Sequence, residues 1–271
     1  MINDDSKKLE ETLSKPDFHQ LWEKTYYSDR NNKFYDLAID KIIKIINLDT
    51  NAKMLDAGCG NAAHSVRFAE RGYNVFGIDF SEEALKLSQN HILSKNLQTK
   101  IELKKDSILS LSFKDNIFDM VYCWGVLMHI SDNEKALLEL SRVLKSGGYL
   151  ILGECNMNSV QSRIARIWKK NHSDERMIIN EVGLHFWSDS DAGEILVRKT
   201  NINWLNKFLM RKGLSLYKRL PGQFTSLYIR VKNKFLRNVI YIFNEYWFKI
   251  VKNSSLAEAN ILIYKKEDQV S

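Results

Sequence analysis

The chain has 271 residues, of which 44% are hydrophobic and 27% are charged. This composition excludes a chain that is mainly disordered, and the length fits one α/β domain with additions better than two separate domains. The sequence has no apolar run of about 18 residues, so it predicts no membrane-spanning helix. The polar N-terminus lacks the basic and then apolar pattern of a secretory signal, and we therefore expect a cytoplasmic protein.

The first part of the chain alternates between buried strand patterns and helical patterns. Such alternation predicts a sheet of parallel strands with helices in the crossovers. The predicted elements are a helix over 36–47, a strand over 53–57, a helix over 63–71, a strand over 74–79, a helix opened by Ser81, strands over 101–105 and 117–123, a helix over 133–144 and a strand over 149–154.

The second part of the chain is less regular. Between about 156 and 200 the pattern assigns no element with clarity. Beyond it we expect a helix over 203–212, a strand over 214–219 and a last strand over 259–264.

One segment before the last strand combines apolar periodicity with positive charge. It predicts a long amphipathic helix over 224–251. This helix could bind a lipid-linked or phosphorylated substrate, lie at an anionic membrane surface, or pack its apolar face on the core. The apolar face comprises Phe224, Tyr228, Val231, Phe235, Val239, Ile242, Tyr246 and Ile250.

The formal net charge of +7 is unevenly distributed. The segment from Arg198 to Lys252 holds thirteen bases and one acid, so it carries +12 and the rest of the chain −5. This asymmetry indicates an anionic partner, unless the segment is only a solvated basic face. A phosphorylated substrate or a lipid headgroup suits it better than nucleic acid, because the sequence has no base-methylation or RNA-binding motif.

The predicted strand over 53–57 runs into a glycine turn of the kind that binds nucleotides. Gly58 and Gly60 lack side chains, so a ligand can approach the backbone at the start of the next helix. Asp79 follows roughly 20 residues later and can accept hydrogen bonds from ribose hydroxyls. Because this also satisfies the dinucleotide fingerprint, a nicotinamide-dependent oxidoreductase is one alternative.

Further motifs favour a different cofactor. With them, the sequence resembles the class I S-adenosylmethionine-dependent methyltransferases, in particular small-molecule enzymes with a methyltransferase type 11-like core. The resemblance spans about residues 36 to 155, and it rests on motifs that stand in the right order. These motifs are Leu55-Asp56-Ala57-Gly58-Cys59-Gly60, Val75-Phe76-Gly77-Ile78-Asp79-Phe80-Ser81, Phe118-Asp119-Met120-Val121 and Leu140-Ser141-Arg142-Val143-Leu144-Lys145-Ser146-Gly147-Gly148.

The resemblance implies that S-adenosylmethionine is the cofactor and gives a role to each matching residue. One departure is Ala62, where many relatives have a third glycine. The implied cofactor-binding residues are Asp56 for the ammonium group, Gly58 and Gly60 for the methionine moiety, Asp79 for the ribose hydroxyls, Phe80 against the adenine, Asp106 near the adenine amino group and Trp124 near the sulfonium, together with the adjacent Ser107 and Cys123.

The catalytic candidates are two histidines. His129 follows the fourth strand near the expected methyl position, and an imidazole can accept a proton at neutral pH. His185 lies in the segment where relatives build a substrate lid. In resembling sequences a histidine at the position of His129 often only packs or bonds the backbone. His185 and Glu154, which ends the fifth strand, are weaker candidates than His129. Methyl transfer needs no covalent enzyme intermediate. Cys59, Cys123 and Cys155 are too far apart in the chain to predict a disulfide framework or a zinc site, so the sequence indicates no metal.

These observations predict an α/β fold: a Rossmann-like, doubly wound, seven-stranded sheet with the last strand antiparallel, an N-terminal helical lid and a C-terminal helical insertion. The lid would span 1–35 and use Trp22, Tyr26 and Tyr27, although a plain helix packed against the sheet suits this segment equally. The cofactor-binding core would span 36–155, and the substrate side with the last two strands 156–271. The expected activity is methyl transfer to oxygen of a small-molecule, glycan or lipid-linked anionic acceptor, with possible contact to the inner membrane face through 224–251. The alternative from another class is a methyltransferase-like subunit that does not catalyse alone.

Overall fold

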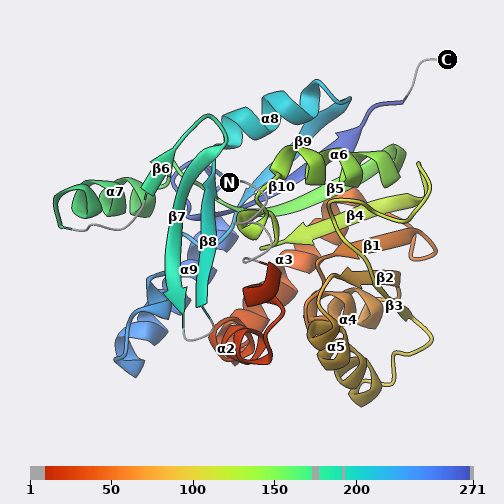
Figure 1. The fold of residues 1–271 in the computed structure, drawn as a ribbon, viewed down its shortest axis with the longest axis horizontal. Coiled ribbons are helices and arrows are strands. Elements are labelled where there is room, and N and C mark those ends of the chain that lie inside the picture. The colour runs from red at the N-terminus through yellow and green to blue at the C-terminus, as the bar shows by residue number, and fades with distance from the viewer. Residues whose placement is uncertain (1–9, 173–176, 191–192, 269–271) are drawn as a thin grey trace.

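The computed structural model of the protein describes residues 10–172, 177–190 and 193–268. Its centre is a seven-stranded sheet in the order β3-β2-β1-β4-β5-β10-β9 (Figure 1). The neighbouring pairs from β3 to β5 are parallel, whereas β10 runs antiparallel to both β5 and β9. The predicted seven-stranded sheet with an antiparallel last strand is therefore confirmed.

The elements of this sheet lie close to their predicted positions. Its strands are β1 (Lys53–Ala57), β2 (Asn74–Asp79), β3 (Ile101–Lys105), β4 (Phe118–Trp124), β5 (Leu144–Cys155), β9 (Leu214–Pro221) and β10 (Ala259–Lys266). The helices around it are α2 (Pro16–Tyr26), α3 (Asp29–Ile46), α4 (Ala63–Glu70), α5 (Glu82–Ser94), α6 (Asn133–Val143), α8 (Ile202–Met210) and α9 (Lys234–Ile250), with the 3-10 turns η1 (Leu127–His129) and η2 (Leu227–Ile229).

The hydrophobic core has two layers, one on each face of the sheet. Ile39 and Phe68, from α3 and α4, belong to one layer, and Leu140 and Leu205, from α6 and α8, belong to the other. The central strands are buried on both faces, which explains why they read as continuous apolar runs. Polar side chains cap the helices: Ser81, for example, accepts a hydrogen bond from the backbone N–H of Ala84 at the start of α5.

The stretch that the sequence left unassigned forms a helix and a second sheet. These elements are α7 (Val160–His172), β6 (Met177–Ile179), β7 (Gly183–Ser190) and β8 (Gly193–Thr200), with the strands antiparallel in the order β6-β7-β8. The small sheet lies across the carboxyl end of the large one. Arg198 of β8 donates a hydrogen bond to the carbonyl oxygen of Leu127 at 3.0 Å, and the Thr200 hydroxyl donates one to Glu154 at 2.5 Å.

The predicted helix over 224–251 begins later than expected, and the expectation that its apolar face packs on the core is wrong. The helix begins only at Lys234, where the Asn233 side chain accepts a hydrogen bond from the N–H of Leu236, and η2 precedes it. Phe235, Ile242 and Tyr246 of the predicted apolar face are 78%, 55% and 63% exposed. The opposite face, with Asn244 and Phe248, contacts the core. The apolar face of α9 therefore does not pack on the core.

Within the described residues, no helix combines the length and the apolar character that crossing a membrane requires.

Candidate active site

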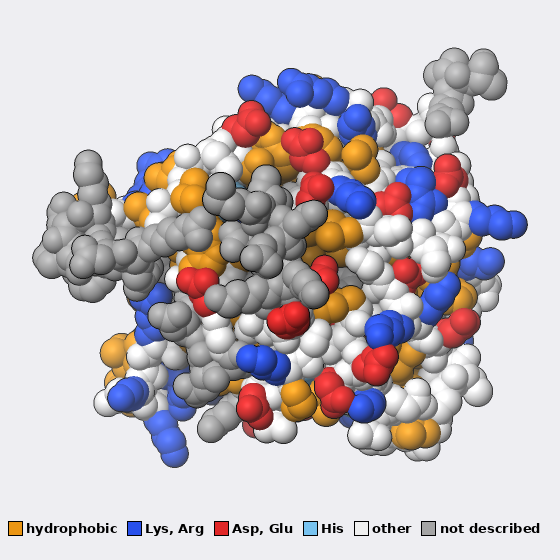
Figure 2. Space-filling view, viewed as in Figure 1, with side chains coloured by type: hydrophobic (Ala, Val, Ile, Leu, Met, Phe, Trp, Pro, Cys, Tyr) orange, Lys and Arg blue, Asp and Glu red, His pale blue; other side chains and the backbone are white. Residues whose placement is uncertain are grey.

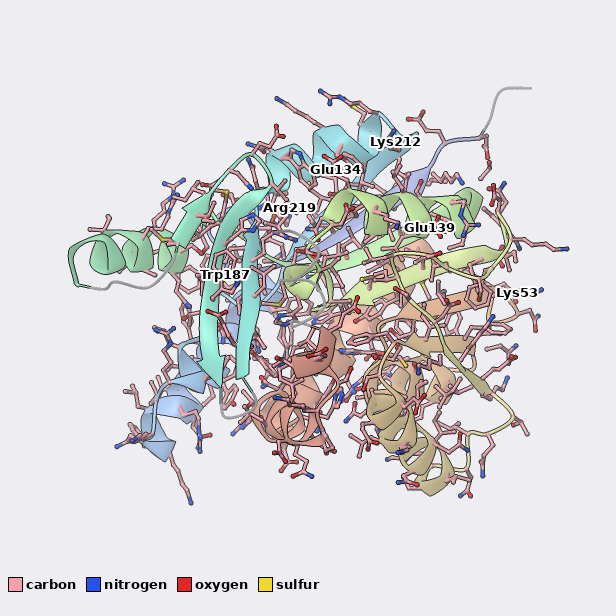
Figure 3. The ribbon with its side chains drawn as sticks, in the orientation of Figure 1. Lys53, Glu134, Glu139, Trp187, Lys212 and Arg219 are labelled. Atoms are coloured by element: carbon pink, nitrogen blue, oxygen red, sulfur yellow. The ribbon has the colours of Figure 1, made fainter. Side chains whose placement is uncertain are left out.

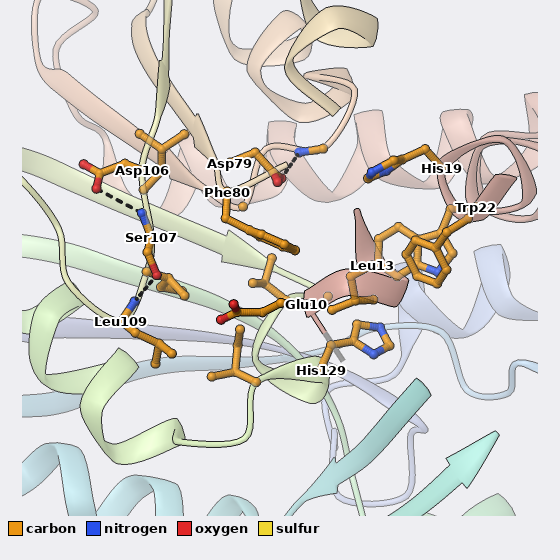
Figure 4. Close-up of a pocket in the computed structure, with 18 of the residues that line it drawn as sticks. Glu10, Leu13, His19, Trp22, Asp79, Phe80, Asp106, Ser107, Leu109 and His129 are labelled. Carbon is orange, nitrogen blue, oxygen red and sulfur yellow. Dashed lines mark hydrogen bonds between the residues drawn. The ribbon is translucent and has the colours of Figure 1, made fainter. Parts of the chain in front are cut away.

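A pocket of about 110 Å³ lies at the carboxyl ends of the central strands, between them and the N-terminal segment (Figure 4). Ligands of open α/β sheets bind at this edge. Its lining comprises Glu10, Leu13, Phe18, His19, Trp22, Gly58, Gly60, Ile78, Asp79, Phe80, Asp106, Ser107, Ile108, Leu109, Gly125, Val126, His129, Ile130 and Ser131.

The glycine turn between β1 and α4 forms the floor of this pocket. Gly58 and Gly60 have φ angles of +77° and +56°, a region that glycine enters without steric cost. A Cβ atom on Gly58 would lie 2.5 Å from Cγ2 of Val126, whereas one on Gly60 would meet no atom within 4 Å. Gly58 is thus required by packing, and Gly60 leaves open space where a ligand can approach the backbone.

Asp79 connects the end of β2 to the glycine turn. Its carboxylate accepts hydrogen bonds from the N–H groups of Gly60 and Ser81, both at 3.0 Å. Burial raises the pKa of Asp79, and these backbone donors act in the opposite direction. The carboxylate lines the pocket in the position from which it can accept further hydrogen bonds from a diol.

Asp56 does not line the pocket but lies buried beneath the turn. The Ser65 hydroxyl donates a hydrogen bond to it at 2.6 Å. Burial raises the pKa of Asp56 to about 7, since removal from water disfavours the charged form. A bound ammonium group nearby would stabilise the carboxylate.

Phe80, Asp106 and Ser107 occupy the other end of the pocket. The Phe80 side chain packs against the small cluster formed by Leu13 and Phe18 of the N-terminal segment. Asp106 accepts a hydrogen bond from the N–H of Ser107 at 2.9 Å, which Figure 4 marks, and two more from Ser112. These bonds fix the loop after β3 against the pocket.

Cys123 and Trp124, at the end of β4, are not brought into the pocket. Cys123 is fully buried in the core layer next to α6, and burial raises the pKa of its thiol. The Trp124 ring turns to the other face of the sheet, where it stacks on Tyr122 with 5.8 Å between ring centroids. Gly125 and Val126, which follow them, line the pocket instead.

His129 lies in the pocket wall, on η1. Its Nδ1 is 2.7 Å from the carbonyl oxygen of Leu196, which can only accept, so Nδ1 carries the proton and Nε2 presents a lone pair. Among the described residues, Nε2 has no hydrogen-bond partner. Burial lowers the pKa of His129 to about 4, so the imidazole is neutral at pH 7. The Trp22 ring packs edge-on against it, with 5.4 Å between centroids.

His185 and Glu154 lie outside the pocket lining. His185, on β7, is 3.1 Å from the Asn180 side-chain oxygen, and burial lowers the pKa of this histidine to about 4. Glu154 is buried beneath the small sheet, where burial raises the pKa of its carboxyl to about 7. Its bond from Thr200 joins the two sheets, which gives Glu154 a structural part in the fold.

The N-terminal segment covers the pocket with residues that the sequence indicated only in part. Of the three predicted lid aromatics, Trp22 lines the pocket, whereas Tyr26 and Tyr27 do not. Phe18 and His19 on α2 line it as well, and His19 Nε2 is 2.9 Å from the Ser81 hydroxyl. The spacing of Phe18, His19 and Trp22 along one helix face was the signal that could have found them.

The fold and this pocket define a class of protein, a Rossmann-like enzyme that binds a nucleoside-type cofactor over the glycine turn. Residues 48–205 match the family model described as a methyltransferase domain. The match covers more than half of the chain, and the chain therefore belongs to this family, the class I S-adenosylmethionine-dependent methyltransferases.

Individual relatives agree with the family. A ubiquinone biosynthesis O-methyltransferase of Nitrosomonas europaea is 28% identical over 141 residues, which cover 52% of this chain and 59% of that protein. A demethylmenaquinone methyltransferase of Lactiplantibacillus plantarum is 33% identical over 127 residues, which cover 46% and 53%. The chain thus spans somewhat more than half the length of these relatives.

Solved structures share the fold over nearly the whole chain. An S-adenosylmethionine-dependent methyltransferase from Clostridium acetobutylicum has a TM-score of 0.62 at 16% identity and covers 93% of this chain and 98% of its own. One from Methanosarcina mazei has a TM-score of 0.60 at 22% identity, with 84% and 97% covered. At these identities, the likeness shows the fold alone.

The chemistry of the residues around the pocket fits S-adenosylmethionine. The open space over Gly60 admits a ligand against the backbone, and the Asp79 carboxylate lies beside it. The half-buried Phe80 ring offers an apolar surface for a base, and Asp106 and Ser107 offer polar groups close by.

Proposed function

We propose that this protein transfers the methyl group of S-adenosylmethionine to an oxygen atom of a small-molecule, glycan or lipid-linked acceptor. A hydroxylated quinone precursor is the first acceptor to test. The names of the relatives support this choice, since one is an O-methyltransferase of ubiquinone biosynthesis and another acts on demethylmenaquinone.

The observation that carries transfer to oxygen is Nε2 of His129, which is buried in the pocket wall with the Trp22 ring against the imidazole and has no hydrogen-bond partner among the described residues. An attacking hydroxyl must lose a proton, and a neutral imidazole whose other nitrogen is fixed by Leu196 can accept it. Because burial holds the pKa of His129 at about 4, the ring stays in this form across the neutral range.

The remaining chemistry is alignment. S-Adenosylmethionine would supply a sulfonium-bound methyl group: the acceptor oxygen bonds to the methyl carbon as the bond from carbon to sulfur breaks, and S-adenosylhomocysteine is the leaving group. Asp79 would hold the ribose hydroxyls, the turn at Gly58 and Gly60 would receive the methionine moiety, and Asp56 would attract the ammonium group. Trp22 and Phe80 would exclude water from the pocket, which strengthens the polar interactions inside it.

The test is methyl transfer from methyl-labelled S-adenosylmethionine to a short-chain catechol and to a polyprenyl catechol in vesicles. His129→Gln is expected to lower kcat about 10²-fold or more while the Kd for S-adenosylmethionine changes little. His185→Gln is the matched control, because His185 lies outside the pocket, and it should keep kcat. Equal losses in both variants would contradict the role of His129.

Measurements of cofactor binding and of methyl transfer together distinguish two rival functions. A methyltransferase-like subunit that needs a partner would bind S-adenosylmethionine and transfer no label to any acceptor. A nicotinamide-dependent oxidoreductase would bind NADH instead of S-adenosylmethionine.

We further propose that the acceptor is taken from an anionic membrane surface at the inner face. The support is the exposed apolar face of α9 together with the basic residues Arg230, Lys234 and Arg237 beside it. Polybasic segments with an apolar face bind such surfaces. Sedimentation with anionic but not with neutral vesicles is expected, and equal binding to both would contradict the electrostatic part of this proposal.

A further inference from the structure

A second cavity lies between α7, the small sheet, η2 and α9. Its volume is about 390 Å³, within the range of pockets that hold small molecules, about 300–1,000 Å³. It shares no lining residue with the pocket over the glycine turn. The lining comprises Val160, Gln161, Ile164, Ala165, Arg166, Met177, Leu184, Phe186, Lys199, Phe224, Thr225, Leu227, Arg230 and Phe243.

The chemistry of this lining is complementary to that of an amphipathic, anionic ligand. Nine of the fourteen lining residues are apolar, three are cations, and none is an acid. Lys199 is paired with Glu258 at 2.6 Å, so the excess charge comes from Arg166 and Arg230. The two polar side chains are already bonded, since Gln161 and Thr225 bond each other. What the cavity offers a ligand is therefore apolar contact and two guanidinium groups.

The surface around the cavity has the same character. Among the described residues, thirteen of the twenty large hydrophobic side chains that are exposed lie on α7, β6, η2 and α9. They are Ile164, Ile167, Ile178, Ile179, Leu227, Ile229, Phe235, Leu236, Val239, Ile242, Phe243, Tyr246 and Ile250. Figure 1 places α7, β6 and α9 at one end of the molecule, and Figure 2 shows Lys and Arg beside hydrophobic side chains there.

We infer that this cavity binds one acyl chain of an anionic phospholipid, with the lipid phosphate held by Arg166 and Arg230 at its mouth. The inference deepens the membrane contact proposed above for α9 and rests on it, and the cavity that it assigns is separate from the cofactor pocket. An acyl chain fits the apolar lining, and a guanidinium group is suited to bind a phosphate. The exposed apolar side chains around the mouth would then lie in the headgroup region.

A second copy of the chain is the less suitable occupant of this surface. Pairing two such faces would bring Arg230, Lys232, Lys234 and Arg237 of both copies together, and like charges at an interface oppose association. An anionic lipid surface complements the same charges.

The experiment uses the full chain and phosphatidylglycerol with short, brominated acyl chains, kept monomeric. Bromine quenches tryptophan fluorescence at short range. Trp247 reports on the cavity because its ring lies 4.5 Å from that of Phe224 and 6.1 Å from that of Phe243, both of which line it. Saturable quenching is expected in the wild type, and Trp247→Phe should remove most of it. Each methylene added to both chains should raise the affinity about fourfold, since only one chain enters the cavity.

One pair of variants distinguishes binding in the cavity from binding to the surrounding surface. Ala165→Phe fills the cavity, and Ile167→Phe places the same phenyl side chain on the same helix at an exposed position outside the lining. The first should lose saturable binding and the second should keep it. The Kd for S-adenosylmethionine, measured on the same preparations, should be unchanged in both, so that a failure of the proposed function is read separately.

The charged pair is tested with anionic vesicles. Arg166→Gln with Arg230→Gln should weaken binding about thirtyfold, on the basis of the usual attraction of each basic residue to an anionic surface. Arg211→Gln with Lys212→Gln removes the same charge at the end of α8, far from α7 and α9, where Figure 3 labels Lys212, and should weaken binding less than threefold. The inference is overturned if Ala165→Phe binds the monomeric lipid like the wild type, if quenching persists in Trp247→Phe, or if the two charge pairs behave alike.

Discussion

Replacing each glycine of the turn by alanine should damage the protein in different ways. Gly58→Ala forces a φ of +77° on an L residue, which costs roughly 1–2 kcal/mol, and drives a methyl group to 2.5 Å from Val126, which costs roughly 1–3 kcal/mol more. Gly60→Ala has only the first cost, because its Cβ meets no atom within 4 Å. That methyl group instead enters the space that the cofactor needs.

Thermal unfolding and calorimetric titration measure the two effects. In a chain of this size, each kcal/mol lowers Tm by about 2–4 °C, so Gly58→Ala, with a total cost of roughly 2–5 kcal/mol, should lose about 4–20 °C and Gly60→Ala about 2–8 °C. The affinity for S-adenosylmethionine should fall about tenfold or more in Gly60→Ala. If Gly58→Ala keeps the wild-type Tm, or if Gly60→Ala binds S-adenosylmethionine with wild-type affinity, the reasoning about this turn is refuted.

Three further substitutions test other parts of the structure. Burial raises the pKa of Asp56 from 3.8 to about 7, so the folded protein retains a proton that the unfolded chain releases in this window, and stability falls as the pH rises through it. The wild type should therefore lose stability relative to Asp56→Asn as the pH rises. The free energy of unfolding of the variant minus that of the wild type, measured by urea unfolding, should increase by about 2–3 kcal/mol between pH 5 and pH 8, and a difference that does not change with pH would contradict the raised pKa. Gly153→Ala should cost about 1–3 kcal/mol, because its Cβ would overlap the Trp124 indole; an unchanged Tm would argue against this packing. Arg198→Met removes the hydrogen bond from β8 to the Leu127 carbonyl oxygen. Relative to the wild type, amide hydrogen exchange should become faster in β7 and β8 and stay unchanged in β1, whereas equal changes in all three strands would contradict the role of this hydrogen bond in holding the small sheet.

The large sheet could be predicted because its signals are local. The strands over 74–79 and 101–105 match the structure at both ends, and Ser81 caps α5 as expected. The glycine turn and Asp79 could be placed together because the carboxyl ends of parallel strands meet at one edge of the sheet.

Other features depend on tertiary contacts that the local pattern does not contain. β4 is buried on both faces, so alternation could not tell that Cys123 and Trp124 turn away from the pocket. The small sheet is bonded to the carboxyl end of the large one through Arg198 and Thr200. Polar and apolar residues do not alternate regularly in the sequences of β7 and β8, although each strand has eight residues. The apolar face of α9 has the spacing of a helix, but spacing alone does not say whether other elements of the protein cover that face.

The most direct test of the central claim is a calorimetric titration of the purified protein with S-adenosylmethionine and S-adenosylhomocysteine, with NADH as the control. We predict micromolar binding of the two sulfur compounds and no binding of NADH. Binding of NADH without binding of S-adenosylmethionine would contradict the assignment of the cofactor, and with it the proposed methyl transfer.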